Sequence, residues 1–355
     1  MSRTEKSLVA IARALAVEAD VLVLDEPTAS LPADEVERMF EVLRDLRAKG
    51  VGMIYVSHRL DEIFRLADRV AVLRDGKLVG TRYVKNTTPT ELVNLIVGRE
   101  VKDLYFRANR ATGTETLNVK NVSTFGAGPV SFAAREGEVL GLVGLRGAGQ
   151  EAIGRALFGA QECTGEVTLN GRRLSLTSPQ AALEQGIGLV ARDRTEESVA
   201  PSLSVRENMF LNPLAMGRRL MSVLSPSAEA GQAEAIGRNV GLRPNEPSLA
   251  VEALSGGNQQ KIVVGRWLAT SRKLLIAEDP TAGVDVGAKS EIYRLIGKAL
   301  EDGLTVIVVS TDFEEVAHIC HRALVFSRGR IVAEIDKGDL TTQSLIHAAS
   351  ASEAA

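Results

Sequence analysis

The stretch that decides the fold is Leu254–Asp285, which reads LSGGNQQKIVVGRWLATSRKLLIAEDPTAGVD. Its glycine pair behind Ser255 predicts a helix start, whose exposed backbone N–H groups and positive dipole end suit a phosphate. Its second apolar run ends in Glu278 and Asp279, which predicts a buried strand that brings two acids to the carboxyl edge of a sheet. Either piece alone is equally compatible with a helix cap or a core strand without chemistry. Together they indicate an α/β fold with an anion site and with acids that could hold Mg²⁺ or orient water.

These pieces resemble the signature sequence and the Walker B strand of ABC-type ATPases. The resemblance implies a P-loop NTPase-type domain that binds ATP and Mg²⁺. It also implies that the signature residues contact the nucleotide, and in this chain they are Ser255, Gly256, Gly257, Asn258 and Gln259.

The same pattern occurs twice in the chain. A shift of 253 residues, which lays Leu254 on Met1, also aligns the following pairs: Pro280 with Pro27, Gly303 with Gly50, Ser310 with Ser57, and Gly329 with Gly76. A register kept over this length indicates the duplication of a whole domain. We therefore expect two ABC ATPase domains, each with a mixed or parallel sheet flanked by helices, and a helical subdomain in the second.

The expected boundaries follow from this duplication. Residues 1–100 would be the carboxyl-terminal portion of a first domain, 101–116 a linker, 117–340 the second domain, and 341–355 a helix and tail. The second half opens near Leu117, and 254 minus 117 predicts 137 further residues before Met1 in an equivalent first half. We therefore expect that the chain is an amino-terminally truncated fragment or carries a misassigned start. Alone it would lack a first Walker A loop.

Composition excludes several classes of function. Hydrophobic residues make up 45% of the chain and charged residues 25%, which is ordinary for a globular protein. A net charge of −3 and only 4% aromatic residues give no basis for nucleic-acid binding. No apolar run reaches the roughly 20 residues that span a bilayer, so contact with a membrane would require a partner. The two cysteines, Cys163 and Cys320, have no metal-type spacing.

The first half carries an acid pair. The apolar run Val21–Leu24 predicts a strand, and Asp25 and Glu26 follow it. In the family that the chain resembles, Asp25 would hold Mg²⁺ through water and Glu26 would polarise the attacking water, which agrees with the electrostatic needs of phosphoryl transfer. His58 stands at the position of the family's switch histidine, although a lone histidine is more often structural.

The second half has a glycine-rich loop between the predicted strand Gly137–Val143 and a helix. Gly144, Gly147 and Gly149 suit a backbone nest around phosphate. The reactive positions of a Walker A loop differ, because Gln150 replaces the lysine and Glu151 replaces the hydroxyl that binds Mg²⁺. A carboxylate beside a triphosphate is repulsive unless a cation offsets it.

Two further departures occur in the second half. Glu278 and Asp279 reverse the order of Asp25 and Glu26, and Thr311 occupies the position of His58. Glu278 would then be the metal ligand of a degenerate site. We expect weak or no hydrolysis there, and nucleotide binding is left open.

The resemblance implies that two halves close head to tail around ATP. The consensus site would join Asp25, Glu26 and His58 to the signature at 255–259. The degenerate site would join Gly144–Glu151 and Glu278 to the altered first signature at 2–7. A second copy of the chain could supply part of such a pairing.

The asymmetric pair of sites resembles bacterial monosaccharide importers. That resemblance implies integral-membrane permease partners, a separate substrate-binding protein, and a peripheral position at the cytoplasmic face of the inner membrane. Two alternatives stay open: a non-transport twin ABC ATPase that acts on ribosomes or DNA, and a truncated, non-catalytic remnant.

Overall fold

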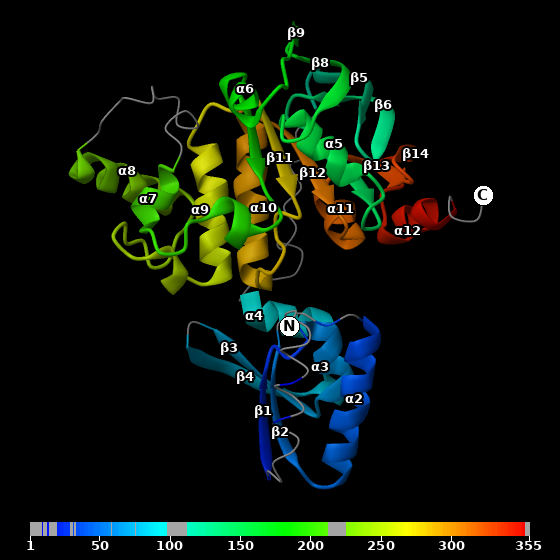
Figure 1. Cartoon of the computed structure of the whole chain (residues 1–355). Coiled ribbons are helices and arrows are strands. Elements are labelled where there is room, and N and C mark those ends of the chain that lie inside the picture. The colour runs from blue at the N-terminus through cyan, green and yellow to red at the C-terminus, as the bar shows by residue number, and fades with distance from the viewer. Residues whose placement is uncertain are drawn as a thin grey trace. The chain divides into compact units, whose positions relative to one another are not determined.

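The computed structural model describes residues 9, 13, 20–28, 31, 33–57, 59–74, 76–97, 112–211 and 225–351. The chain divides into two compact units, Met1–Val101 and Lys102–Ala355 (Figure 1). His58 and the predicted first signature at 2–7 lie outside the described residues.

The first unit is a small α/β unit. Its elements are β1 (Val21–Asp25), α2 (Ala33–Ala48), β2 (Gly52–Val56), α3 (Leu60–Leu66), β3 (Arg69–Arg74), β4 (Lys77–Tyr83), the 3-10 helix η1 (Val84–Asn86) and α4 (Pro89–Val97). β1 and β2 pair in parallel, whereas β3 and β4 form an antiparallel hairpin that contacts α4. Helix α2 supplies Phe40 and Leu43, both buried, to a core that includes Leu22 and Leu24 of β1.

Within the described part of the first unit, the β1–β2 sheet has buried or half-buried side chains on one face and exposed side chains on the other. Leu22 and Leu24 are buried, but Val23 is 63% exposed and Ile54 of β2 is 56% exposed. The continuous apolar run of β1 is therefore half-exposed, although such runs are typical of strands buried on both faces.

The second unit has two sheets. Its strands are β5 (Glu115–Thr124), β6 (Ala127–Arg135), β7 (Val139–Gly144), β8 (Cys163–Leu169), β9 (Arg172–Arg173), β10 (Ile187–Val190), β11 (Leu274–Glu278), β12 (Thr305–Ser310), β13 (Arg322–Ser327) and β14 (Arg330–Asp336). The larger sheet has the order β10-β11-β12-β7-β13-β14 and is parallel except for β14. The smaller sheet, β6-β5-β8-β9, is antiparallel.

The helices of the second unit connect and cover these sheets. They are α5 (Gln150–Leu157), α6 (Pro179–Glu184), the π-helix η3 (Arg194–Ser198), α7 (Val205–Met209), α8 (Pro226–Asn239), the 3-10 helix η4 (Val251–Ala253), α9 (Gly256–Leu268), α10 (Val286–Glu301), α11 (Phe313–Ile319) and α12 (Thr342–Ala351). None of the helices in the described ranges is long and apolar enough to cross a bilayer.

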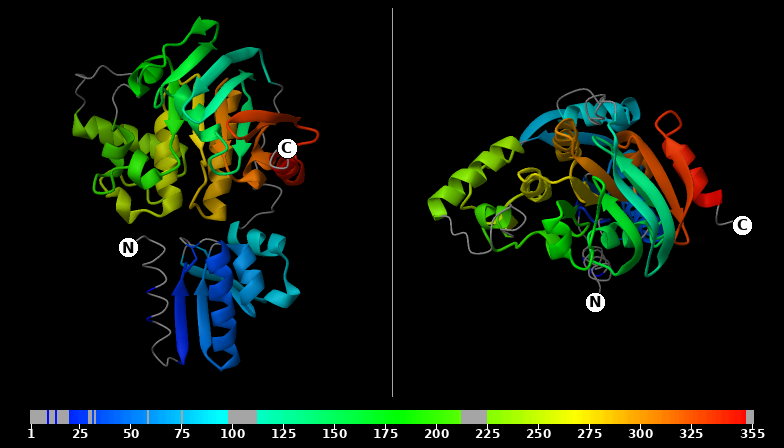
Figure 2. Two further views of the ribbon diagram at one scale, coloured as in Figure 1. Left: turned by 45° about the vertical axis from the view of Figure 1, so that its right-hand side comes forward. Right: turned by 90° about the horizontal axis from the view of Figure 1, so that it is seen from above.

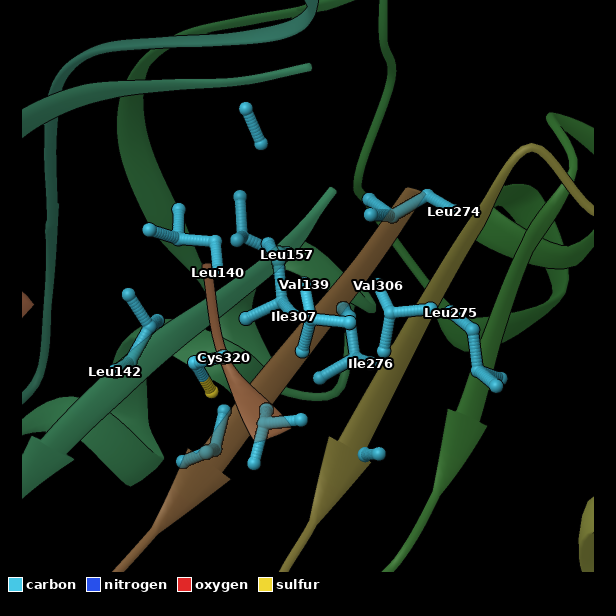
Figure 3. Packing of buried hydrophobic residues seen from close by; sticks show 14 of the residues in the cluster. Val139, Leu140, Leu142, Leu157, Leu274, Leu275, Ile276, Val306, Ile307 and Cys320 are labelled. Atoms are coloured by element: carbon cyan, nitrogen blue, oxygen red, sulfur yellow. The ribbon is translucent and has the colours of Figure 1, made fainter. Parts of the chain in front are cut away.

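The main core lies on both faces of the larger sheet. Helix α5 contacts β5 and β6 of the smaller sheet as well as β11, β12 and β7 of the larger one. Helix α11 contacts β7 and β12 as well, and every residue of β7, β11 and β12 is buried. Figure 3 shows Leu140, Leu157, Ile276 and Ile307 packed together in this core.

A helical subdomain stands beside the sheet in the second unit, as the sequence predicted. Helices α7, α8 and α9 share a separate core that includes Met209, Ile236 and Ile262. Figure 2 shows these helices projecting from one side of the unit. Helix α7 begins with a capping box, because Ser204 Oγ accepts from the Glu207 N–H and the Glu207 carboxylate accepts from the Ser204 N–H.

The backbone repeats at the predicted shift of 253 residues. Gly50 and Gly303 have φ values of 91° and 88°, and Gly76 and Gly329 have values of 73° and 78°. Glu26 and Asp279 are both non-glycine residues with positive φ, 45° and 39°. Their N–H groups make equivalent 2.8 Å hydrogen bonds, to Val56 O and Val309 O. The duplication therefore extends to local geometry.

The strands of the second unit that were predicted lie close to their expected positions. β5 begins at Glu115, two residues before the expected start, and β7 lies within one or two residues of Gly137–Val143. β6 and β8 were not predicted, because their mixed polar composition lacks a clear alternation. These strands build the smaller sheet against which α5 packs.

Candidate functional site

The glycine-rich loop of the second unit joins β7 to α5. Gly147 and Gly149 have φ values of 81° and 108°, which favour glycine. A Cβ atom at Gly149 would also lie 2.7 Å from Gly329 Cα, so this position requires glycine on two grounds. The chain therefore turns tightly into α5, the geometry that presents backbone N–H groups to an anion.

Gln150 is turned into this loop. Its side chain is fully buried, and Nε2 donates to the carbonyl oxygens of Gly144 at 3.0 Å and Leu145 at 3.2 Å. Among the described residues, its Oε1 atom has no hydrogen-bond partner. The side chain at the expected lysine position therefore holds the loop together and carries no charge for a phosphate.

Glu151 and Asp279 are bridged by one arginine. Arg192 lies just after β10, with Nη1 2.6 Å from Glu151 Oε1 and Nε 2.5 Å from Asp279 Oδ2. Burial lowers the pKa of Arg192, but the Asp279 charge and the hydrogen bond with Glu151 outweigh it and hold that pKa above its ordinary value. The guanidinium is therefore a fixed positive charge between two carboxylates.

Glu278 is held by a second arginine. Arg155 of α5 donates from Nε and Nη2 to the two oxygens of Glu278, at 2.9 and 2.8 Å. The same guanidinium donates to Glu197 of η3 at 2.7 and 2.9 Å. Hydrogen bonding to Glu197 and then to Glu278 raises the pKa of Arg155 although burial lowers it. Glu278 is nearly inaccessible, with a side chain 4% exposed.

Asp279 has both oxygens engaged. Oδ1 accepts from Ser310 Oγ at 2.8 Å and from the Thr311 N–H at 3.1 Å, while Oδ2 faces Arg192. Thr311, which stands at the position corresponding to His58, thus contributes its backbone. Both oxygens of Asp279 are therefore held by contacts within the protein, and Oδ2 faces a cation.

The acids of the second unit do not fit a magnesium ion. Mg²⁺ prefers an octahedral set of oxygens that usually includes several waters. Here Glu151, Glu278 and Asp279 are all paired with arginine. Within the described ranges, no group of three or more His, Cys, Asp or Glu side chains is arranged to hold a metal.

The signature residues begin α9. Ser255 caps the helix by accepting from the Asn258 N–H at 3.4 Å, and Asn258 Nδ2 donates to Ser255 Oγ at 3.0 Å. Gln259 Nε2 donates to the carbonyl oxygens of Val251 and Leu254, and its Oε1 accepts from Arg194 Nε at 3.1 Å. The loop that carries Arg192 and Arg194 thus touches both the acid cluster and the signature.

Packing also accounts for the glycines of the signature. A Cβ atom at Gly257 would lie 2.5 Å from Ala288 Cβ of α10, and one at Gly256 would lie 3.1 Å from Gly283 O and 3.0 Å from Arg194 Nη2. The close approach of α9 and α10 therefore requires Gly257 whether or not a phosphate binds. Exposed Ser255 and half-buried Gly256, Asn258 and Gln259 are the accessible part of the motif.

The acids of the first unit have a different environment. Asp25 ends β1, and both Asp25 and Glu26 are exposed. The left-handed φ of Glu26 and its N–H bond to Val56 O fix the backbone at the carboxyl end of the sheet. These carboxylates keep the accessibility that Glu278 and Asp279 have lost.

Each unit contains a buried glutamate that was not predicted from the sequence. Glu62 of α3 accepts from Thr28 Oγ1 at 2.7 Å, Tyr55 OH at 2.7 Å and Ser57 Oγ at 3.0 Å. Its counterpart Glu315 of α11 accepts from Thr281 Oγ1 at 2.7 Å and Tyr293 OH at 3.0 Å, and it lies 3.0 Å from Ser310 Oγ. The sequence does carry a signal for this pair. Glu62 and Glu315 align at the shift of 253 residues, and each lies within the apolar face of a helix.

The two glutamates have different neighbouring charges. Glu62 pairs with Arg59 at 3.0 Å, whereas Asp312 stands at the corresponding position beside Glu315. Burial raises the pKa of Glu315 above its ordinary value of 4.5, hydrogen bonds from its hydroxyl partners oppose the rise, and the Asp312 charge adds to it.

The structure thus brings together only part of the predicted sites. Gly144–Glu151, Glu278, Asp279 and Thr311 form one cluster in the second unit, linked by Arg155 and Arg192. The consensus site draws on residues of both units and on His58, and it stays a prediction. The arginine pairing was also missed, because sequence placed Arg192 near the loop without showing which acids it faces.

Comparisons with known proteins agree with this architecture. The ABC transporter family matches residues 127–282. A relative from Agrobacterium fabrum, named for ribose/galactose/methyl galactoside import as an ATP-binding protein, is 39% identical over 354 residues, 99% of this chain and 71% of that protein. The ribose import ATP-binding protein RbsA of Chromobacterium violaceum is 40% identical over 352 residues, which are 98% of this chain and 70% of that protein.

Solved structures show the same fold. An ATP-binding cassette of an ABC transporter has a TM-score of 0.56 at 20% identity and matches 66% of this chain and 98% of its own. A dimeric cassette in a post-hydrolysis state, bound to ADP and Pi, has a TM-score of 0.54 at 22% identity and matches 62% of this chain and 98% of its own.

Proposed function

Because this chain belongs to the family of ABC-type import ATP-binding proteins that includes the ribose and galactose import proteins, we propose that it is the energy-coupling subunit of a monosaccharide importer. In this proposal, the chain binds ATP and contributes one consensus and one degenerate site. The observation that carries the asymmetry is the pairing of Glu278 and Asp279 with arginines, set against the exposed Asp25 and Glu26.

The proposed hydrolysis uses the acids of the first unit. Glu26 orients and polarises a water whose oxygen attacks the terminal phosphorus, and the bond to the ADP oxygen breaks. Asp25, an exposed carboxylate at the strand end, would hold Mg²⁺ through water. Bound Mg²⁺ neutralises charge on the phosphates. His58 would sense the γ-phosphate, and Ser255–Gln259 would contribute the signature to this site.

The degenerate site would lie at Gly144–Glu151 and Glu278. Its loop offers backbone N–H groups, but Gln150 and Glu151 provide neither the positive charge nor the hydroxyl that triphosphate and metal require. We propose that this half binds nucleotide weakly, if at all, and does not hydrolyse it.

The proposed partners follow from the family. Permease subunits in the membrane and a separate substrate-binding protein would provide the path and the sugar selectivity, and the chain would sit peripherally at the cytoplasmic face of the inner membrane. Conformational closure of the ATPase halves would be transmitted to the permease through the loop at Arg192–Arg194.

A pair of isosteric substitutions tests the asymmetric function. In the protein expressed with any coding sequence upstream of Met1 retained and with its permease, we expect Glu26→Gln to lower ATP turnover by about 10²-fold or more, because a water-polarising group is lost. Asp279→Asn should change ATP turnover less than about twofold, because both oxygens of Asp279 are already engaged by Ser310, Thr311 and Arg192. Equal losses in the two variants would contradict the proposal. ATP-dependent sugar uptake by membrane vesicles is the second measurement.

A further inference from the structure

The second unit contains a cation that belongs to the protein itself. The arginine bridge, defined as Glu151, Arg192 and Asp279, spans the end of the glycine loop, the segment after β10 and the end of β11. These are three separate segments at the carboxyl edge of one sheet. Its side chains are 31%, 28% and 12% exposed, so water screens the bridge only partly.

The bridge occupies the place where a divalent cation would bind. One guanidinium nitrogen faces Glu151 and another faces Asp279, so a metal ion could ligate both carboxylates only after displacing Arg192. The other oxygen of Asp279 is also engaged, because Oδ1 accepts from Ser310 and Thr311, and both oxygens of Glu278 bind Arg155. The positive charge of Arg192 also weakens the attraction that Glu151 and Asp279 would exert on a dication.

An ordinary surface ion pair would not have this arrangement. Exposed pairs join two side chains, contribute little and leave oxygens to solvent. Arg192 instead joins two acids from different segments, and its own backbone N–H donates to Glu278 Oε2 at 3.3 Å. Glu151, Glu278 and Asp279 are thus all held by a connected set of contacts with two arginines, and both oxygens of Asp279 take part in it.

We propose that Arg192 replaces the divalent cation in the second unit, so that this half of the molecule binds no Mg²⁺ and is held together by its own guanidinium. The inference does not rest on sugar transport. If Arg192 alone prevents metal binding, Glu151 and Asp279 should bind a metal ion when residue 192 carries no charge.

Direct titration with Mn²⁺, read by electron paramagnetic resonance of the free ion, tests this proposal on the whole chain. Wild type and Asp279→Asn should give the same isotherm, because Asp279 binds no metal when Arg192 is present. Arg192→Met, which keeps an unbranched apolar stem and removes the charge, should gain one site that binds Mn²⁺ at least about tenfold more tightly than any site of wild type. Adding Asp279→Asn to Arg192→Met should abolish the gained site.

Arg194→Met is the matched control, because Arg194 lies on the same segment but donates to the Gln259 amide oxygen. It should leave the isotherm unchanged. Fluorescence of Trp267, the sole tryptophan, verifies that each variant is folded. If Asp279→Asn or Glu151→Gln binds Mn²⁺ more weakly than wild type does, the proposal is wrong. A folded Arg192→Met that gains no Mn²⁺ site would also overturn the proposal. If Arg192→Met does not fold, the comparison of wild type with Asp279→Asn and Glu151→Gln decides the question.

Discussion

At the scale of single residues, the buried Glu315 shows how a duplicated position acquires different chemistry. Ser310 Oγ carries one hydrogen, yet it lies 2.8 Å from Asp279 Oδ1 and 3.0 Å from Glu315 Oε2. If Ser310 donates to Asp279, a protonated Glu315 can donate to Ser310. A neutral Glu315 agrees with its raised pKa, for which burial is the main cause.

This assignment predicts the pH dependence of stability. The unfolded glutamate ionises above about its ordinary pKa of 4.5 while the folded one stays protonated, so the unfolded state binds fewer protons. The stability that Glu315 contributes is therefore full below 4.5 and is lost as the pH rises through the folded pKa, by about 1.4 kcal/mol per pH unit between the two values. Relative to wild type, Glu315→Gln should gain stability over that window.

Urea unfolding followed by Trp267 fluorescence at several pH values measures this difference. Glu314→Gln is the control, because Glu314 is an exposed acid on the same helix. The difference between Glu315→Gln and wild type should grow with pH, and the difference for Glu314→Gln should stay flat. A constant difference for both variants would show that Glu315 is ionised in the folded protein.

At the scale of elements, burial separates strands that the sequence makes nearly equivalent. Ile54 of β2 and Ile307 of β12 are the same residue at duplicated positions, but Ile54 is 56% exposed and Ile307 is fully buried. Helix α5 packs on β12 and accounts for the burial of Ile307.

A matched pair of substitutions measures the effect of that cover. Ile307→Val should lower the free energy of opening of β12 by about 0.5–1.5 kcal/mol, because a buried methylene is lost. Ile54→Val should change β2 by less than about 0.5 kcal/mol, since the same methylene is largely in water. Hydrogen exchange resolved by peptide reports the two strands separately. Equal effects would mean that β2 is covered in solution.

The same comparison shows what sequence could and could not predict. Apolar runs and glycines located β1, β7 and β11 because strand length and turn conformation are local properties. The half-exposure of β1 was not predictable, since burial depends on which other segment packs against a strand. Arg155 and Arg192 were invisible for a related reason: ion pairing across 123 residues, as between Arg155 and Glu278, is set by the assembled sheet edge.

At the scale of the whole molecule, each hydrophobic core is contained within one unit. The main core and the helical-subdomain core draw their described members from 117–349, and the core around Phe40 draws its members from 22–66. A domain with a closed core of its own can fold by itself. We therefore expect a fragment of residues 112–351 to unfold cooperatively, with a sigmoidal urea transition of Trp267 emission and native near-ultraviolet circular dichroism.

Trp267 makes this experiment specific. It is the only tryptophan, it is 7% exposed, and it lies in α9 against Gly188 of β10, where a Cβ atom would approach its ring to 3.0 Å. Its emission therefore reports whether the helical subdomain is seated on the sheet. The fragment carrying Gly188→Val should lose the native signal, because a larger side chain cannot fit beneath the indole. A broad, non-cooperative transition in the unsubstituted fragment would show that the second unit needs the first in order to fold.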